Sequence, residues 1–599
     1  MSILAALVRA QEASGEDLPP GFAVQNVGVL VSLREDGTIA RVVDLRTANG
    51  KRMVPRALAV PAPVKRTVNV LPNRMWDKTA YVFGRSVKDD PKDAQRLEAF
   101  REANLALVEG SDDPGLNAFR RFLETLTPEQ FGEPLFAEDM IDQNVVFALG
   151  DDFMRDEYLH DRPAAREALE RSGETEGEAG GAMACLVTGE RAPIARLHPS
   201  IKGVWGGQSS GGSIVAFNED AFTSFGHDKG DNAPVSEKAT ALYTAALNRM
   251  LADPGHRVQV GDASTVFWAE ADGEEREVVQ NSLAAIMGAR ATGDGMRAAN
   301  PERVKTILEQ VSKGIPTADV APELKGIRAY VLGLSPNAAR ISVRFWLEDS
   351  FVRLADRYGR YAREMRIEPP PRGGLPGVYH LMEEVAPLRK RENVPPNLAG
   401  DTMRAILAGT PYPMTLLTAL LMRLRVDGDV NGRRAAMLRA LLIRNLNAIE
   451  EGALVALDPD FQNRGYLLGR LFAAYEHVQF AALGQVNASL KDKFYGAASA
   501  QPRAVFQQLE KNSSNHLSKV GKSSMGRRVN LEKQIMEIMD RFEPGDDPIP
   551  ASLPVADQAL FGMGYYHQRS KFFERKDSAP DGDAAEDKNE TDSAETIND

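Results

Sequence analysis

The spacing of apolar residues changes along this 599-residue chain, and this change constrains its fold more than any other feature. Up to about residue 350, short runs alternate between apolar and polar residues, as in NVGVLVSLREDGTIARVVDLR around Asp36-Gly37, which is typical of a β-hairpin. Beyond Pro396, apolar residues recur every three or four positions, as in PMTLLTALLMRLR, AAMLRALLIRNLNAIEEGAL and NLEKQIMEIMDRF. The sequence therefore predicts an α+β protein that ends in an α-helical bundle.

The length requires more than one domain, because single hydrophobic cores stop growing at about 250–300 residues. Residues 1–88 are predicted to form a first helix, MSILAALVRAQ, and a β-rich segment with a basic loop, and residues 89–172 an acidic helical insertion. Strand patterns return over 183–368, in SIVAFN, RVQVGDASTVFWAE and ISVRFWLED, and this segment is expected to pack with the first. We expect the helical bundle over 396–576 and a disordered acidic tail over 577–599.

Several classes of protein are excluded by simple counts. No run of 18 apolar residues is present to span a bilayer, and the N-terminus lacks the basic lead-in and cleavage site of a signal peptide, so a cytoplasmic protein without a membrane partner is expected. The single cysteine, Cys185, excludes an intramolecular disulfide. The eight histidines show no zinc-ligand spacing, so the sequence predicts no metal site and no cofactor.

The net charge of -12 argues against a nucleic-acid partner, but the charge is unevenly distributed. The tail over 577–599 holds six Asp and three Glu against one Lys, a net charge of -8. Three stretches are basic: 41–78 has nine Lys and Arg against two acids, 402–450 seven against three, and 485–533 nine against three. Each stretch is either an ordinary solvated surface or a face that binds phosphates.

The first basic stretch contains a candidate loop for contact with DNA, within VKRTVNVLPNRMWDKTAY. Cationic side chains neutralise phosphates, and Asn and Thr can bond to base edges. The candidate contacts are Lys65, Arg66, Thr67 and Asn73. The nearby Trp76 and Tyr81 are better explained as core residues of the next helix.

A second candidate is the turn Gly207-Gln208-Ser209-Ser210-Gly211. It matches G-x-S-x-G, the nucleophile elbow of α/β-hydrolases, so a serine hydrolase built on Ser209 is the alternative function. However, SIVAFN follows it as a strand pattern, whereas the elbow requires a helix. We therefore expect a glycine-flanked loop that offers Gln208, Ser209 and Ser210 to a base edge or a phosphate, or a purely structural hairpin.

The helical part holds cations that would neutralise a phosphate backbone without reading its sequence. They are Arg423, Arg425, Arg433, Arg434, Lys511, Lys519, Lys522, Arg527 and Arg528. Gly521-Lys522-Ser523 resembles the end of a P-loop, which would make Lys522 the centre of an ATP-driven remodeller. The first glycine of that motif falls on His516, so a basic loop between helices is expected instead. No paired carboxylate or Cys/His dyad is evident, so the sequence favours a binding protein with no catalytic residues over an enzyme.

Seven collinear blocks resemble one family, the large subunit of type I-C CRISPR surveillance complexes (Cascade). These blocks are PPGF at 19–22, KRT at 65–67 with LPNRMWDKTAYV at 71–82, CLVTGERAPIARLHPSIKGVWGGQSSGGSIVAFNEDAFTSFG at 185–226, NAPVSEKATALYTAALN at 232–248, GDASTVFWAE at 261–270, LSPNAARISVRFW at 334–346 and GYYHQR at 564–569. The resemblance runs nearly end to end and leaves out only the acidic tail.

The resemblance implies a non-catalytic subunit that recognises the protospacer-adjacent motif on double-stranded target DNA and promotes duplex opening and R-loop formation. Its implied partners are CRISPR RNA, the backbone, RNA-processing and small subunits of the complex, and a helicase-nuclease that it helps to recruit. Guide pairing would then read the sequence, as in other RNA-guided systems. The bundle cations would hold the displaced strand, and the later part of the bundle would also be made as a separate small subunit. No methionine lies between Leu438 and Ser524, so such a product would begin at Met437 or earlier, or at a non-methionine codon.

Overall fold

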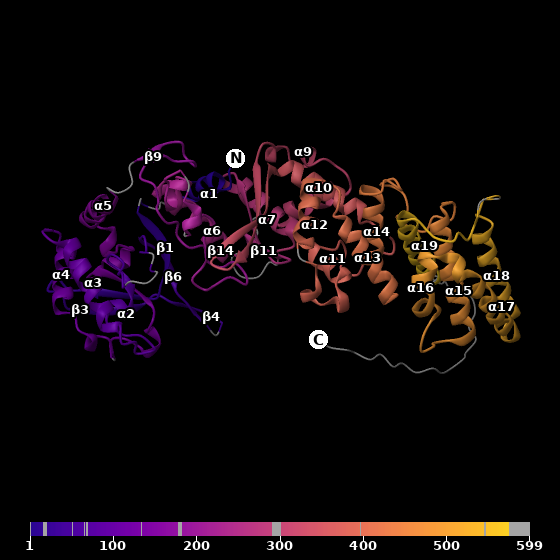
Figure 1. Ribbon diagram of the computed structural model, residues 1–599, viewed down its shortest axis with the longest axis horizontal. Helices are drawn as coiled ribbons and strands as arrows, with labels where there is room; N and C mark the ends of the chain where they lie inside the picture. The colour runs from indigo at the N-terminus through magenta and orange to yellow at the C-terminus, as the bar shows by residue number, and fades with distance from the viewer. Residues whose placement is uncertain are drawn as a thin grey trace. The chain divides into compact units, whose positions relative to one another are not determined.

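The computed structural model confirms the α+β class and describes residues 2–15, 19, 21–50, 52–64, 66, 70–132, 134–177, 182–217, 219–223, 225–289, 301–395, 397–543, 545 and 547–573. The chain divides into two compact units (Figure 1). Unit one comprises Met1–Arg360, Gly377–Tyr379 and Pro395–Thr410, and unit two comprises Tyr361–Pro376, His380–Val394 and Pro411–Asp599. The predicted acidic tail over 577–599 lies outside the described residues.

Unit one contains every strand that the structure describes. The strands are β1 (Phe22–Val27), β2 (Val29–Leu33), β3 (Ile39–Asp44), β4 (Thr47–Asn49), β5 (Arg52–Val54), β6 (Arg56–Pro61), β7 (Asp77–Lys78), β8 (Asn144–Leu149), β9 (Met183–Ala184), β10 (Arg191–Ala192), β11 (Arg257–Val260), β12 (Ala263–Glu270), β13 (Arg328–Asn337) and β14 (Arg340–Ser350). Its helices are α1 (Ile3–Glu12), α2 (Thr79–Val82), α3 (Asp93–Val108), α4 (Pro114–Thr125), α5 (Pro163–Gly177), α6 (Glu237–Ala252), α7 (Gly273–Met287), α8 (Pro301–Ser312), α9 (Thr317–Val320) and α12 (Leu398–Ala408).

The first four-stranded sheet has the order β3-β2-β8-β7. The hairpin predicted around Asp36-Gly37 is present, because β2 and β3 pair antiparallel. Strand β8 pairs parallel with β2, with Val29 opposite Val145, although the sequence predicted helix throughout 89–172. The run NVVFAL is buried in the centre of the sheet and shows no alternation, so periodicity could not identify it as a strand.

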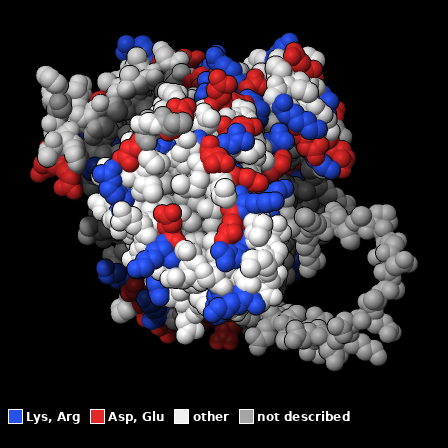
Figure 2. All heavy atoms as spheres, turned by 90° about the vertical axis from the view of Figure 1, so that its right-hand side faces the viewer, with Lys and Arg blue, Asp and Glu red and all other residues white. Residues whose placement is uncertain are grey.

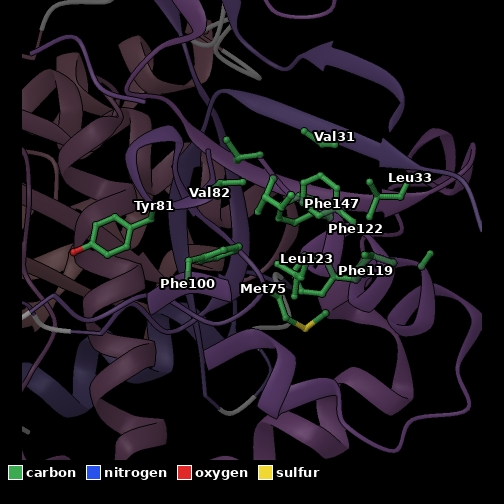
Figure 3. Close-up of a cluster of buried hydrophobic side chains, with 14 of the residues drawn as sticks. Val31, Leu33, Met75, Tyr81, Val82, Phe100, Phe119, Phe122, Leu123 and Phe147 are labelled. Carbon is green, nitrogen blue, oxygen red and sulfur yellow. The ribbon is translucent and has the colours of Figure 1, made fainter. Parts of the chain in front are cut away.

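Helices α3 and α4 cover this sheet and share its hydrophobic core. Figure 3 shows Phe119 and Phe122 of α4 beside Phe147 of β8, with ring centroids of Phe119 and Phe147 4.8 Å apart. Phe100 of α3 is fully buried in the same cluster. The acidic segment after residue 89 is therefore part of the core of the N-terminal sheet.

The second four-stranded sheet is antiparallel, in the order β11-β12-β13-β14, as RVQVGDASTVFWAE and ISVRFWLED predicted for three of its strands. Trp268, Tyr330 and Trp346 stack along one face, with centroids 5.1 and 5.6 Å apart. Two expectations for this part were wrong. Helices α6, α7 and α8 lie among the expected strands, and SIVAFN forms no strand but only isolated bridges at Gly212 and Ser213.

Helices α10 (Phe351–Glu364) and α11 (Val378–Val385) contribute residues to both units. Unit two holds the helices of the predicted bundle from Pro411 onward, whereas α12, at the start of the predicted range 396–576, belongs to unit one. The remaining helices of unit two are α13 (Met414–Asp427), α14 (Gly432–Arg444), α15 (Arg464–Leu483), α16 (Leu490–Ala500), α17 (Phe506–Ser523), α18 (Met525–Met539) and α19 (Val555–Phe573). Helix α15 packs against α16, α17, α18 and α19. Glycines permit the closest of these contacts, since a Cβ at Gly469 or Gly564 would overlap the backbone of the facing helix.

Among the described helices, none combines the length and apolarity that a bilayer span requires.

The buried imidazole of His567 should make unit two sensitive to acid. Burial, reinforced by Arg439 and Arg470, lowers the pKa of His567 from 6.5 to about 4. As the pH falls below about 6.5, the unfolded chain takes up a proton that the folded imidazole does not, so stability falls until the pH reaches about 4. We expect a loss of about 2 kcal/mol at about pH 5 from this group.

Urea unfolding of the wild type and of His567→Gln at about pH 7 and about pH 5, followed by circular dichroism, measures this contribution. Between the two pH values, the free energy of unfolding of the variant should fall by about 2 kcal/mol less than that of the wild type. His477 and His516, whose pKa values burial also lowers, remain in both proteins and cancel in the comparison. Equal losses in the two proteins would contradict the assignment.

Candidate nucleic-acid interface

In the loop between β6 and β7, the candidate cation Arg66 is folded inward. Lys65 and Thr67 lie outside the described residues. The Arg66 Nε donates to the carbonyl of Leu71 at 2.6 Å, and its guanidinium pairs with the buried carboxylate of Asp77. The same guanidinium lies 3.9 Å from the ring centroid of Tyr81. In this conformation Arg66 holds the loop against the protein.

Asn73 also shapes this loop. It is 3% exposed, its Oδ1 accepts the N–H of Val64 at 2.9 Å, and its own N–H donates to Asp77 at 2.8 Å. Trp76 and Tyr81 are buried, and the indole of Trp76 donates to the carbonyl of Pro61 at 2.8 Å, so the core interpretation of both aromatics is confirmed. The buried carboxamide of Asn73 faces protein here, and contact of Arg66 or Asn73 with DNA stays a prediction.

Two segments far apart in sequence meet beside this loop. The Lys202 Nζ donates to Gln25 Oε1 of β1 at 3.2 Å. The side chain of Lys202 is exposed as a whole, but partial burial of its ammonium group, and then the positive charge of Lys78 at the end of β7, lower its pKa. Within the described residues, neither lysine forms an ion pair with a carboxylate. Two positive charges that repel each other, with no carboxylate paired to either, favour the approach of an anion.

Sequence reasoning missed Lys202 and Gln25 because neither stands in a cluster of charges. One signal was present, since no Asp or Glu occurs between Glu190 and Glu219. An acid-free stretch of this length in a chain with 84 acids means that no residue close to Lys202 in the sequence can neutralise its charge.

The candidate turn lies a few residues after Lys202. Gln208, Ser209 and Ser210 are all exposed, and the turn is closed by the N–H of Gly211, which donates to the carbonyl of Gln208 at 2.9 Å. Gly211 has a φ of +85°, and a Cβ there would collide with the carbonyl of Ile201, so glycine is required. The turn thus presents the side-chain amide of Gln208 and the hydroxyls of Ser209 and Ser210 on a backbone whose conformation Gly211 fixes.

The nucleophile elbow is not formed. Residues after Gly211 make isolated bridges, Ile201 with Gly212 and Ser213 with Arg340, and no helix follows. A strand-turn-helix arrangement is what forces the serine of an α/β-hydrolase out of its turn. The geometry around Ser209 therefore lacks the feature on which the hydrolase alternative depended.

Four of the predicted bundle cations are held by groups within unit two. Arg434 is 1% exposed and donates to the Asp427 carboxylate at 2.7 Å and to the Asp429 carbonyl at 2.9 Å. Arg423 pairs with Asp427 at 3.4 Å, and Arg425 bonds to the side chain of Gln558. Arg433 lies 3.9 Å from the carboxylates of Glu383 and Glu384. These arginines connect α13, α14 and neighbouring segments, which accounts for them without DNA.

The predicted cations that lie later in the chain are found on helices α17 and α18. The stretch around Lys522, predicted as a basic loop between helices, is the end of helix α17, whose buried face includes Leu509, Ser513, Leu517 and Val520. The helical repeat of 3.6 residues places its lysines away from this face, and all three are exposed. We call these lysines, together with the exposed Arg527 of α18, the basic strip: Lys511, Lys519, Lys522 and Arg527.

No residue of the basic strip forms an ion pair with a carboxylate of the described residues. The single acid of α17 is Glu510. The other predicted cation, Arg528, is half-buried and pairs with Glu532 at 2.8 Å. Figure 2 shows the molecule from the side on which α17 and α18 lie, with lysines and arginines around a broad uncharged area and most carboxylates toward the top. Sequence periodicity alone could have identified the strip.

Lys522 does not belong to a P-loop. Gly521, Lys522 and Ser523 form the last turn of α17, whereas a P-loop wraps phosphates between a strand and the start of a helix. Nothing in this geometry supports an ATP-driven remodeller.

The chain was compared with models of known protein families. A family model of CRISPR-associated proteins matches residues 4–573, which cover most of both units, including the candidate turn and the basic strip. This protein is therefore a CRISPR-associated protein. More specifically, because the match covers nearly the whole chain, it belongs to the family of CRISPR-associated protein Cas_Csd1, and the family resemblance of the seven sequence blocks is confirmed. Among curated proteins, none matches the chain.

Proposed function

We propose that this chain is the non-catalytic large subunit of a type I-C RNA-guided surveillance complex, in which it binds the target DNA. It would assemble with CRISPR RNA and with backbone, RNA-processing and small subunits. The observation that supports the proposal most strongly is that both units expose cations without carboxylate partners, at Lys78 and Lys202 in unit one and along the basic strip in unit two. In a chain with a net charge of -12, such cations indicate surfaces that meet an anion.

Unit one would recognise the motif that flanks the target on double-stranded DNA. Lys78 and Lys202 are suited to a phosphate, which fixes the register of the duplex without reading its sequence. The exposed Gln208 amide can bond twice to adenine in the major groove, and the adjacent hydroxyls can donate or accept. The proposal thus assigns positioning to the lysines and base readout to the turn.

Unit two would hold the strand that guide pairing displaces and so stabilise the R-loop. Lys511 and Lys522 are eleven residues apart, which is about 16 Å along α17, or about five nucleotides of a stacked strand. Exposed lysines in a row suit a backbone of any sequence. Recruitment of a helicase-nuclease to the opened duplex completes the proposed role.

Binding of the reconstituted complex, with guide RNA, to duplexes randomised over the flanking base pairs tests the roles in unit one. Lys78→Ala with Lys202→Ala should weaken binding to all sequences alike and reduce the slope of log affinity against log salt by about 1.8, because two phosphate contacts are lost. Gln208→Ala with Ser209→Ala should instead flatten the sequence preference by about 1–3 kcal/mol per base pair read.

Lys88→Ala with Lys92→Ala is the matched control, since these exposed lysines of unit one remove the same charge beside Asp89 and Asp90. It should leave affinity and preference unchanged. If the wild-type complex shows no flanking preference, the motif-reading role fails. If the turn variant keeps the preference, the base readout lies elsewhere in the chain.

A further inference from the structure

The acidic tail is an addition to the part of the chain that matches the family. The family match ends at residue 573, which is also the last residue of α19. The residues that follow include the nine acids and single lysine of 577–599. The family match therefore covers the helices and strands of both units but not the tail.

The tail begins on the same unit as the basic strip. Helix α19 packs on α15, and α15 also packs on α17 and α18, which carry the strip. The 23 residues of the tail span at most about 80 Å when fully extended, and α17 is about 27 Å long. The tail is therefore long enough to reach every residue of the strip from the end of α19.

The two segments are complementary in charge. The strip offers four cations with no acidic partner among the described residues, and the tail offers nine carboxylates. Carboxylate and phosphate oxygens accept the same charge-assisted hydrogen bonds from lysine and arginine. A tethered segment also acts at a local concentration on the order of millimolar, so weak binding in cis is sufficient.

We propose that the acidic tail, residues 577–599, binds the basic strip of its own chain and competes with single-stranded nucleic acid for it. The proposal rests on the function proposed for the strip. A strand displaced by guide pairing is held in place by the rest of the complex and displaces the tail. Unrelated single-stranded DNA or RNA lacks that support, so the tail weakens its binding to the strip. The tail therefore makes occupancy of the strip depend on target recognition.

The test compares the full chain with a chain ending at residue 573 and with a full-length chain in which the nine tail acids are replaced by their amides. Each is titrated against fluorescent oligo(dT) at low and at physiological salt. Removal of the tail should raise affinity about tenfold at low salt, and less at physiological salt, because the contact between tail and strip is electrostatic. The amide variant keeps the length of the tail and should behave like the shortened chain.

A strip-neutral variant, with Lys511→Gln, Lys519→Gln, Lys522→Gln and Arg527→Gln, separates direct competition from general repulsion by charge. In this background, removal of the tail should change affinity less than twofold. An equal gain in both backgrounds, or no gain in the wild-type background, overturns the proposal while leaving DNA binding by the strip intact. If neither the full nor the shortened chain binds oligo(dT), both this proposal and the strip's proposed function fail.

A synthetic peptide of residues 577–599 supplies a second measurement. Added to the shortened chain, it should displace oligo(dT), and the peptide with its acids replaced by amides should not. Displacement by both peptides, or by neither, would contradict competition by the carboxylates.

Discussion

Neutralising the basic strip should weaken binding of the full chain to single-stranded DNA about 100-fold at about 0.15 M salt. Each phosphate contact on a single strand contributes about 0.7 to the slope of log affinity against log salt, so four contacts contribute about 2.8. At about 0.15 M salt this slope corresponds to roughly two orders of magnitude in affinity relative to 1 M. Glutamine keeps the length and helix propensity of the lysines, so α17 should stay folded.

Fluorescence anisotropy of labelled oligo(dT) across a range of salt concentrations measures both the affinity and the slope. The matched control replaces four exposed lysines of unit one with glutamine: Lys238, Lys305, Lys313 and Lys325. This control removes the same total charge and should change affinity by no more than about twofold, since distant exposed charges are screened at this salt concentration. An equally large loss in the control would show that net charge, and not the strip, determines binding.

Replacing Glu364 with alanine should destabilise unit two by about 3–5 kcal/mol, the usual cost of leaving one partner of a buried ion pair alone. The Glu364 carboxylate is fully buried and accepts from Arg444 Nε at 3.0 Å, with Arg444 Nη2 at 2.7 Å from its other oxygen. Tyr412 donates its hydroxyl to the same carboxylate at 2.8 Å, and its ring lies 4.3 Å from the Arg444 guanidinium. Without Glu364, the buried guanidinium would lose the carboxylate with which it pairs.

All four tryptophans of the chain lie in unit one, which separates the two units experimentally. In urea, Glu364→Ala should shift the circular dichroism transition of the helical unit and leave the tryptophan fluorescence transition in place. The triple variant Glu364→Leu, Arg444→Met, Tyr412→Phe removes the whole polar group and should recover most of the stability, because apolar residues of similar volume often replace a buried pair without loss. A loss below about 1 kcal/mol in the single variant would refute the importance of this pair.

The local elements were predicted well where their pattern was strong. The turn at Asp36-Gly37 predicted the hairpin of β2 and β3, and the three- and four-residue spacing of leucines predicted α13. The predicted helix 435–454 ends at Arg444 as α14, and Asn447 soon after has a φ of +47°, outside the helical region. Signals of this kind lie within a few neighbouring residues, so one sequence is enough to read them.

The candidate site was predictable only in part. Gln208, Ser209 and Ser210 were expected on an exposed, glycine-flanked loop, and the structure places them there. Asn73 was expected at DNA but is buried, because its partners are backbone groups of the loop and the carboxylate of Asp77. No local pattern reports whether a polar side chain is bonded inside the protein or left for a ligand.

The sequence by itself determined the α+β class, the C-terminal helical bundle, the family, and the presence of basic stretches in an acidic chain. Only the tertiary structure decided which of those cations are exposed and free of carboxylate partners, and so can bind an anion. Arg434 and Lys522 are equally basic in sequence, yet Arg434 is enclosed by Glu384 and Asp427 while Lys522 is exposed on the outer side of α17. The structure likewise brought Lys202 to Gln25, 177 residues away in the sequence. The reason is physical: a charge is neutralised by what lies near it in space, and folding, not sequence order, sets that distance.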